Sequence, residues 1–289
     1  MSEMRSEDAP RRTVRAAENR GGEAGAERGI DDLYDDRLDV LVIRDALPAR
    51  PLAHAAALLA RADRDRTWSR PNAVAPLDDI HILGTDTPAT PTYSAPTGAS
   101  LDAYLSGATK HRAQTADLFP SEFDVISEVE TALSRTAGGR PVEGARASDG
   151  RPFTPFTVRR LVEGKQIGLH HDYHYRLPLY SQLAPLLDTR TLISWVFTLQ
   201  APSSGGELMV YGVTSDATDV PKDAYGRPDL TSVEKMFDVA SFATNTGDLF
   251  LLASGRCYHR VSPISGTSRV TMGGFLALDR QRERVLYWS

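Results

Sequence analysis

Three side chains in the C-terminal half of the chain, His170, Asp172 and His259, are of the types that hold a transition metal. Two neutral imidazoles and one carboxylate on one face of a metal ion leave its opposite face open to a cosubstrate and dioxygen. This donor set is typical of mononuclear iron(II) sites. The sequence therefore predicts an oxygen-activating enzyme.

The spacing of the first two candidate ligands selects them over their neighbour. Side chains alternate between the two faces of a strand, so His170 and Asp172 are predicted to point one way and His171 the other. A single His-x-Asp triplet is weak evidence, because short motifs recur by chance. Its position before a distant strand that carries His259 makes the metal interpretation stronger.

An arginine and a threonine, Arg269 and Thr271, follow the second histidine on a further predicted strand. Arginine in a strand is most often a solvated edge residue, but the run from Arg269 to Phe275 is apolar enough to be internal. A buried arginine needs an anionic partner. The fork of Arg269 and the hydroxyl of Thr271, on the same strand face, are suited to one carboxylate of a dicarboxylate.

Other residues near the triad are weaker candidates. His171 and His174 suggest an alternative zinc or cupin-type cluster, but this version lacks a fitting carboxylate. Cys257 is interpreted as a small packing residue, since three better ligands are already present. Arg260 is adjacent to His259 and is therefore expected on the opposite face of its strand.

The composition is that of an ordinary globular protein, with 289 residues, 41% hydrophobic and 25% charged. A net charge of −5 argues against a general nucleic-acid binder. The single cysteine excludes an internal disulfide framework. No segment has the apolar length of a membrane helix or of a signal peptide, so we expect a cytoplasmic protein with no membrane partner.

The organisation along the chain predicts one domain behind a tail. Residues 1–30 contain no aromatic residue and no leucine, which predicts a disordered N-terminal tail. Residues 31–289 are expected to form a single domain, with helical support in 31–150 and a β core in 151–289. The long polar segment 212–238 interrupts the strands and is expected to form a lid-like insertion.

The pattern within the domain is mainly β with flanking helices. Helices are predicted at 52–60, after two prolines, and at 121–137, before Gly138-Gly139. Residues 71–106 are predicted to be loop-rich. Strands are predicted at 38–43, 156–162, 166–170, 192–199, 207–211, 248–252, 257–261, 269–278 and 284–288. Many short strands with glycine-rich corners are typical of a barrel or a sandwich.

The order His-x-Asp…His…Arg-x-Thr resembles the iron(II)- and 2-oxoglutarate-dependent dioxygenases, from about Phe153 to the C-terminus. The runs 158–167 and 273–278, with the ending Tyr287-Trp288-Ser289, are similar to a narrower group. That group contains the carrier-independent halogenases of the welwitindolinone type and hydroxylases of N-substituted amino acids. The resemblance implies a double-stranded β-helix (jelly-roll or cupin-like) core.

The resemblance also implies a role for each matched residue. His170, Asp172 and His259 would bind Fe(II), and Arg269 with Thr271 would hold the distal carboxylate of the cosubstrate 2-oxoglutarate, with O2 as the oxidant. Halogenases of this group carry a small residue in place of the carboxylate, which leaves a position for halide. Since this chain has Asp172 there, we expect hydroxylation or a related oxidation rather than chlorination.

The expected partner is a small molecule of specialised metabolism, and the sequence leaves open whether the chain forms a homodimer. The runner-up is a prolyl-type protein or peptide hydroxylase, because the same site serves it. A non-catalytic ligand-binding β-barrel is the second alternative. A triad that lacks one of its metal ligands would indicate it. The triad of this chain is intact.

Overall fold

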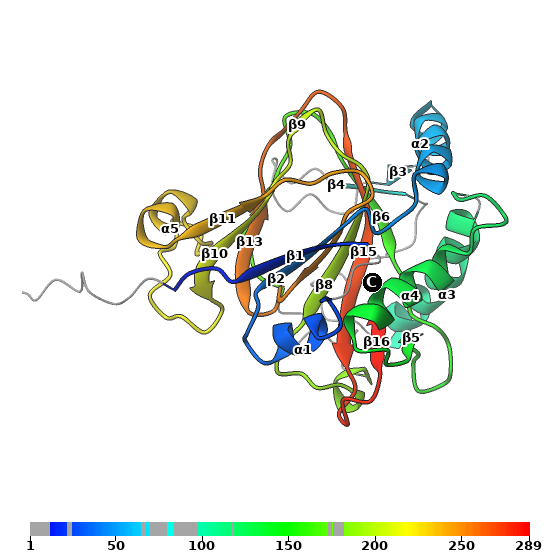
Figure 1. Cartoon of the computed structure of the whole chain (residues 1–289), viewed down its shortest axis with the longest axis horizontal. Helices are drawn as coiled ribbons and strands as arrows, with labels where there is room; N and C mark the ends of the chain where they lie inside the picture. The colour runs from blue at the N-terminus through cyan, green and yellow to red at the C-terminus, as the bar shows by residue number, and fades with distance from the viewer. Residues whose placement is uncertain are drawn as a thin grey trace, which may run out of the picture.

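In the computed structural model of the protein, two β-sheets face each other and helices cover one of them (Figure 1). The structure describes residues 12–21, 25–64, 68–69, 80–83, 98–116, 118–172, 175 and 182–289. No helix in this part of the chain is both long and apolar enough to cross a membrane.

Within the described residues, the larger sheet has ten strands and follows the order β1-β2-β12-β8-β15-β6-β4-β3, with β16 paired to β15 and β5 paired to β16. Its strands are β1 (Ala16–Arg20), β2 (Val40–Arg44), β3 (Trp68–Ser69), β4 (Ile80–Leu83), β5 (Val142–Gly144), β6 (Thr157–Leu161), β8 (Ile193–Gln200), β12 (Leu249–Leu252), β15 (Arg269–Leu278) and β16 (Val285–Trp288). Strand β15 is buried along its whole length. It pairs with β8 on one side and with β6 and then β16 on the other, so it is the centre of the sheet.

In the part of the chain that the structure describes, the smaller sheet has four strands in the order β11-β10-β13-β7. These are β7 (Ile167–His170), β10 (Leu208–Thr214), β11 (Val239–Phe242) and β13 (Cys257–Val261). A short pair, β9 (Ser204–Gly205) with β14 (Ile264–Ser265), lies at one end (Figure 1). Strands β6, β7, β8, β10, β12, β13, β15 and β16 lie where the sequence predicted them, with small differences at their ends.

Helices α2 (Ala49–Arg64), α3 (Gly98–Ala116) and α4 (Val125–Thr136) lie on the far side of the larger sheet from the smaller one (Figure 1). Helix α4 begins where the Asp124 carboxylate accepts the backbone N–H groups of Ile126 and Ser127. It ends before Gly138, which has φ of 69°. Apolar side chains of these helices and of the sheet form one core, which includes Leu52, Tyr104, Leu133, Trp195 and Trp288.

The expectation of a disordered tail over residues 1–30 is wrong for the residues of this segment that the structure describes. Strand β1 pairs in parallel with β2, and α1 (Gly29–Tyr34) begins at the end of the segment. Residues 12–20, here called the N-terminal arm, are held by the buried carboxylate of Asp39, which pairs with Arg12 and Arg15. A specific anionic partner thus holds Arg12 and Arg15, although this segment has no aromatic residue or leucine to bury.

The arm also contacts the smaller sheet. The carbonyl oxygen of Arg12 lies so close to Gly212 of β10 that a Cβ atom there would clash with it. Residues 12–20 therefore connect the edge of one sheet to a strand of the other. Residues 1–11 lie outside the described residues.

The loop-rich passage predicted at 71–106 is also incorrect in part. Strand β4 and the start of α3 fall within it. The remaining positions, 71–79 and 84–97, lie outside the described residues. The helix was missed because its small and polar residues give no apolar face of regular period.

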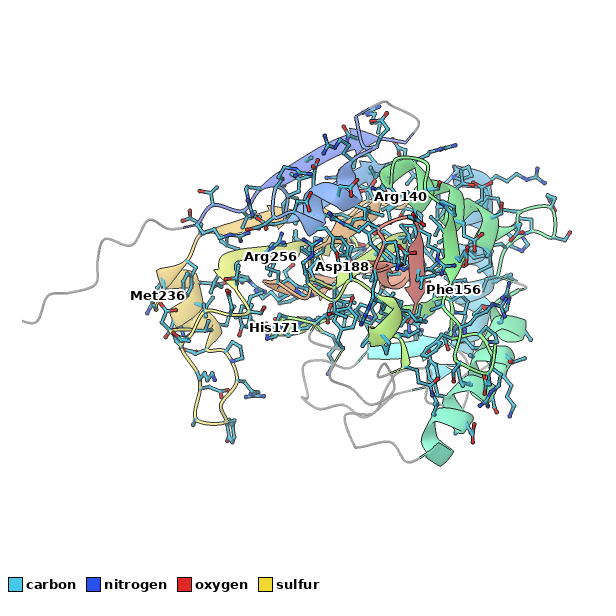
Figure 2. All side chains as sticks on the ribbon, turned by 90° about the horizontal axis from the view of Figure 1, so that it is seen from below. Arg140, Phe156, His171, Asp188, Met236 and Arg256 are labelled. Carbon is cyan, nitrogen blue, oxygen red and sulfur yellow. The ribbon has the colours of Figure 1, made fainter. Side chains whose placement is uncertain are left out.

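The segment 212–238 does not cover the cavity between the sheets. It contains the end of β10 and α5 (Leu230–Met236), and its buried Val220 and Val233 pack with Tyr211 and Tyr258 on the outer face of the smaller sheet. Figure 2 shows Met236 at the opposite end of the molecule from Phe156. The expected lid is instead a cover for the outer face of that sheet, since no residue of 212–238 lines the cavity.

Candidate metal and cosubstrate site

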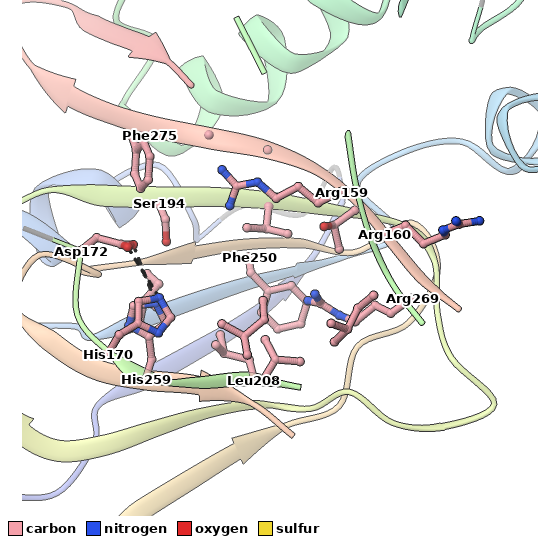
Figure 3. A pocket seen from close by; sticks show the side chains of 18 residues that line it. Arg159, Arg160, His170, Asp172, Ser194, Leu208, Phe250, His259, Arg269 and Phe275 are labelled. Atoms are coloured by element: carbon pink, nitrogen blue, oxygen red, sulfur yellow. Dashed lines mark ion pairs between the residues drawn. The ribbon is translucent and has the colours of Figure 1, made fainter. Parts of the chain in front are cut away.

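The structure brings His170, Asp172 and His259 together at one end of the space between the sheets (Figure 3). One possible ligand atom from each residue lies within 4.8 Å of those of the other two. The Nε2 atoms of His170 and His259 lie 3.7 and 3.8 Å from the two carboxylate oxygens of Asp172. Three donors that converge at this spacing fit a single metal ion.

Strand pairing is what places the two imidazoles side by side. His259 on β13 and His170 on β7 are directly opposite in the antiparallel register. Their ring centroids are 4.3 Å apart. Asp172 follows the end of β7, where its backbone N–H donates to the carbonyl oxygen of Ser254 at 2.8 Å. Each donor is therefore fixed by a backbone contact and not by side-chain packing alone.

Hydrogen bonds to backbone carbonyls determine which ring nitrogen of each histidine faces the site. Nδ1 of His170 lies 2.7 Å from the carbonyl oxygen of Gly168, and Nδ1 of His259 lies 3.0 Å from that of Cys257. A carbonyl oxygen only accepts, so Nδ1 carries the proton and Nε2 keeps its lone pair for a metal. Burial, with the neighbouring His170, lowers the pKa of His259 to about 4, which keeps this ring neutral at pH 7.

The neighbours of the triad lie where strand alternation predicts. His171 points to the outer face, where its ring meets Tyr258 edge-on at 5.0 Å. Arg260 is also on that face and donates from Nε to the hydroxyl of Tyr211 at 2.7 Å. Cys257 is buried, with its thiol 3.5 Å from a carboxylate oxygen of Asp39. His174 lies outside the described residues.

A cavity of about 900 Å³, its open mouth included, extends from the triad between the two sheets. Its walls are mainly apolar, from Val196, Leu208, Phe250, Leu252, Val261 and Phe275. Ser194 of β8 adds a hydroxyl at the triad end (Figure 3). Small-molecule sites are typically apolar cavities with few polar groups, and this one has that character.

Arg269 and Thr271 both line this cavity, and both are buried. Among the residues that the structure describes, no carboxylate lies within ion-pair distance of Arg269, and its Nε has no hydrogen-bond partner. Burial, and secondly the nearby Arg159, lower the pKa of Arg269 to about 10, so the group still carries its charge at pH 7. A buried cation without an anionic partner is costly, so the arrangement fits an anionic ligand.

The turn at Gly205-Gly206 packs against the aliphatic part of the Arg269 side chain. Gly206 has φ of 74°, and a Cβ atom there would lie 3.3 Å from Cδ of Arg269 and 2.8 Å from Cγ of Pro202. Glycine therefore serves both the left-handed backbone and the close approach of the arginine. The sequence does not show which side chain lies against this turn.

A third cavity residue of interest, Arg159, was not singled out from the sequence. It lies on β6 directly opposite Thr271 of β15. Figure 3 shows its guanidinium extending into the cavity, whereas Arg160 points away. Strand alternation separates these two arginines, but the sequence does not tell which of the two faces inward.

Comparisons with known proteins agree with this geometry. Residues 24–289 match the family described as carrier-protein-independent halogenase WelO5. A comparison with curated proteins found no significant match.

Two solved structures of an N-substituted L-amino acid dioxygenase from Burkholderia ambifaria share the fold, each at 14% identity. The complex with alpha-KG gives a TM-score of 0.53 and covers 89% of both chains. The second structure gives 0.50 and covers 92% of this chain and 96% of that one. The shared fold confirms the predicted mainly β architecture with a double-stranded β-helix core. The family match over residues 24–289 confirms the predicted resemblance to the carrier-independent halogenase group.

Proposed function

This chain belongs to the carrier-protein-independent halogenase WelO5 family, and we propose that it is an iron(II)- and 2-oxoglutarate-dependent oxygenase that hydroxylates a small molecule. In the proposed reaction, an unactivated C–H bond, O2 and 2-oxoglutarate give the alcohol, succinate and carbon dioxide. The observation that carries this proposal is the convergence of His170, Asp172 and His259 at one end of the cavity that Arg269 lines.

The residues of the triad suit the metal that this reaction needs. Fe(II) would be held by the Nε2 atoms of His170 and His259 and by Asp172, and it would couple O2 activation to decarboxylation of the cosubstrate. The carbonyl acceptors at Gly168 and Cys257 hold the two rings in the required tautomer. The protein thus supplies two neutral donors and one anionic donor in fixed positions.

The cosubstrate fits the cavity through its charge. Arg269 would pair with the distal carboxylate of 2-oxoglutarate, and Thr271, two residues further along the same face, would donate its hydroxyl. The ligand would give the buried guanidinium the anion that the described residues lack. The apolar walls would exclude water from the reacting C–H bond.

Asp172 supports hydroxylation over halogenation. The family takes its description from a halogenase, and halogenases of this kind are expected to have a small residue where this chain has the carboxylate. Here the two carboxylate oxygens of Asp172 lie 3.7 and 3.8 Å from the Nε2 atoms of the two histidines, which supports a carboxylate that would occupy the position a halide would need. We therefore propose a hydroxylase, with N-substituted amino acids as the first substrate class to test, as in the Burkholderia ambifaria dioxygenase.

The test of this function is succinate release. The purified protein, given Fe(II), 2-oxoglutarate and O2, is expected to form succinate slowly even without substrate, and faster with the correct member of a panel of small molecules. The variant His259→Ala removes one of three donors and is expected to lower succinate release at least about 100-fold, together with the affinity for Fe(II). Retained turnover in this variant would sink the assignment.

A second variant tests hydroxylation against chlorination. Asp172→Gly is expected to lose most hydroxylation and to open a position for chloride, with products measured by mass spectrometry in chloride buffer. The substrate is the panel member that most stimulates succinate release in the native protein. Unchanged hydroxylation would mean that Asp172 does not bind the metal.

A further inference from the structure

Asp172 differs from the two histidines of the triad in how the fold holds it. His170 and His259 lie on paired strands, directly opposite each other. Asp172 lies two residues beyond the end of β7, outside the strand pairing that the structure describes. The position of its carboxylate therefore depends on the backbone contacts that Asp172 makes elsewhere.

Two of these backbone contacts come from one tight turn, residues 253–256, which joins β12 to β13. The backbone N–H of Asp172 donates to the carbonyl oxygen of Ser254 at 2.8 Å. On the next residue, Gly255, a Cβ atom would lie 3.3 Å from the carbonyl oxygen of Asp172. The turn therefore lies against Asp172 at both its N–H and its carbonyl group.

The space at Gly255 does not admit a side chain. A Cβ atom there would lie 2.7 Å from the backbone nitrogen of Leu192 and 2.9 Å from its Cβ atom. The N–H of Gly255 donates to the carbonyl oxygen of the same leucine at 2.9 Å, which holds the turn close to it. Because backbone atoms cannot rotate aside, a methyl group at position 255 must shift the turn, and with it the carbonyl oxygen that holds Asp172.

The turn is also held from its other side. Ser215, which follows β10, donates from its backbone N–H to the carbonyl oxygen of Arg256 at 2.7 Å and from its hydroxyl to that of Gly255 at 3.0 Å. Within the turn, the N–H groups of Arg256 and Cys257 both donate to the carbonyl oxygen of Ala253 at 2.9 Å. The turn is thus a support that the segments next to β8 and β10 keep in place.

Resting on the proposed function, we propose that Gly255 is a positioning residue of the metal site. Its lack of a side chain lets the turn hold the Asp172 carboxylate close to the Nε2 atoms of His170 and His259, from which its oxygens lie 3.7 and 3.8 Å. Metal–ligand distances are defined to within about 0.2 Å, so a small displacement of the turn weakens the bond from Asp172 to the metal. Gly255 does not line the cavity, and it acts on the metal through Asp172.

The test measures binding of Co(II) to the full-length protein after its metal has been removed with a chelator. Calorimetry gives the Kd, and the visible absorption of bound Co(II) reports the arrangement of its ligands. Gly255→Ala is expected to raise the Kd at least about tenfold, which is about 1.4 kcal/mol, and to change the visible spectrum.

Gly21→Ala is the matched control. A Cβ atom at Gly21 would lie 2.6 Å from the carbonyl oxygen of Asp45, which is a backbone clash of similar closeness. This clash lies at the opposite end of β2 from Asp39, whose carbonyl oxygen accepts the N–H of Ala253. Gly21→Ala should leave the Kd of Co(II) within about twofold even where it lowers the free energy of unfolding.

A double variant tests whether Gly255 acts through the carboxylate. In an Asp172→Ala background, which has no carboxylate to position, the further change Gly255→Ala should alter the Kd of Co(II) by less than about twofold. If thermal unfolding shows that Gly255→Ala does not fold, Ser215→Ala is the test, because it removes the hydroxyl that holds the carbonyl group of Gly255. Ser215→Ala should raise the Kd about threefold, and Ser215→Thr, which keeps a hydroxyl, should not.

Two results would overturn the proposal. One is a folded Gly255→Ala protein, or in its place Ser215→Ala, with an unchanged Kd for Co(II). The other is an equal rise of the Kd with and without the carboxylate of Asp172, which would assign the effect to His259 or to the fold as a whole. Neither result touches the proposed oxygenase function, whereas a native protein that binds no Co(II) would overturn the metal site and that function with it.

Discussion

Two arginines of this protein, Arg256 and Arg269, are both largely withdrawn from solvent, but their surroundings differ. Arg256 is paired with Asp39 at 3.1 Å and donates to the carbonyl oxygens of Leu33 and Leu38 at 3.0 and 2.8 Å. Arg269 has no carboxylate within ion-pair distance among the described residues, and it faces a cavity. The first arginine completes its interactions within the protein, whereas the second has a place for a ligand.

The difference distinguishes a buried arginine that stabilises the fold from a buried arginine that binds a ligand. A buried ion pair with additional hydrogen bonds is self-sufficient, and removal of one member leaves an uncompensated charge. A buried cation without such a partner lowers the stability of the free protein and favours any anion that fits. The cluster of Asp39, Arg12, Arg15 and Arg256 is therefore expected to stabilise the fold, and Arg269 to bind the cosubstrate.

The largest effect is expected from Asp39→Asn. This change leaves three arginines around a buried amide, and it should lower the free energy of unfolding by about 4 kcal/mol. Chemical denaturation measures the loss, and the Kd of 2-oxoglutarate in the folded variant should stay within about twofold. Asp36→Asn is the control, since Asp36 meets the same arginines but is half exposed, and it should cost less than about 1 kcal/mol. Equal losses of the free energy of unfolding in Asp39→Asn and Asp36→Asn would contradict the distinction between the buried and the half-exposed carboxylate.

Arg269→Gln should have the opposite profile. The Kd of 2-oxoglutarate is expected to rise about 100-fold, which is about 2.7 kcal/mol, because the carboxylate loses its charged fork. The free energy of unfolding of the ligand-free protein should not fall, since an uncompensated cation has been removed. Arg256→Gln is the matched comparison and should lose stability while it keeps its affinity for the cosubstrate. If Arg269→Gln and Arg256→Gln both lower the free energy of unfolding and neither raises the Kd of 2-oxoglutarate, Arg269 is not a ligand-binding residue.

The smallest effect is a dependence of stability on acid pH. Burial raises the pKa of Asp39, but the backbone N–H of Arg15 and the guanidinium of Arg12 lower this pKa by more. The result is a pKa of about 2. A carboxyl group with a folded-state pKa below its unfolded value near 3.8 stabilises the fold fully above that value. As the pH falls from about 4 to about 2, this contribution of about 2 kcal/mol should be lost.

Unfolding curves at several pH values measure this contribution. The Asp39→Asn variant provides the reference, because its stability should vary less over the same interval. A variant that loses stability as steeply as the native protein would show that other carboxylates are responsible.

Local patterns in the sequence were sufficient for much of the fold. Strands β13 and β15 have the predicted bounds. Helix α4 was predicted, over 121–137, from the glycines after it. The N-terminal arm was missed, because its order depends on Asp39, a partner distant in the sequence. The role of 212–238 was also missed, because a polar segment between strands does not reveal which sheet face it covers.

The sequence by itself determined the chemistry of the site: the residue types and order of His170, Asp172 and His259, and of Arg269 with Thr271. Period-two alternation within a strand also set His171 and Arg260 on the opposite face. Only the tertiary structure decided that β7 and β13 pair with His170 opposite His259, and that Arg159 faces the cavity beside Thr271. The reason is physical: alternation is local, whereas register and inward direction depend on how strands far apart in the chain pack around a common core.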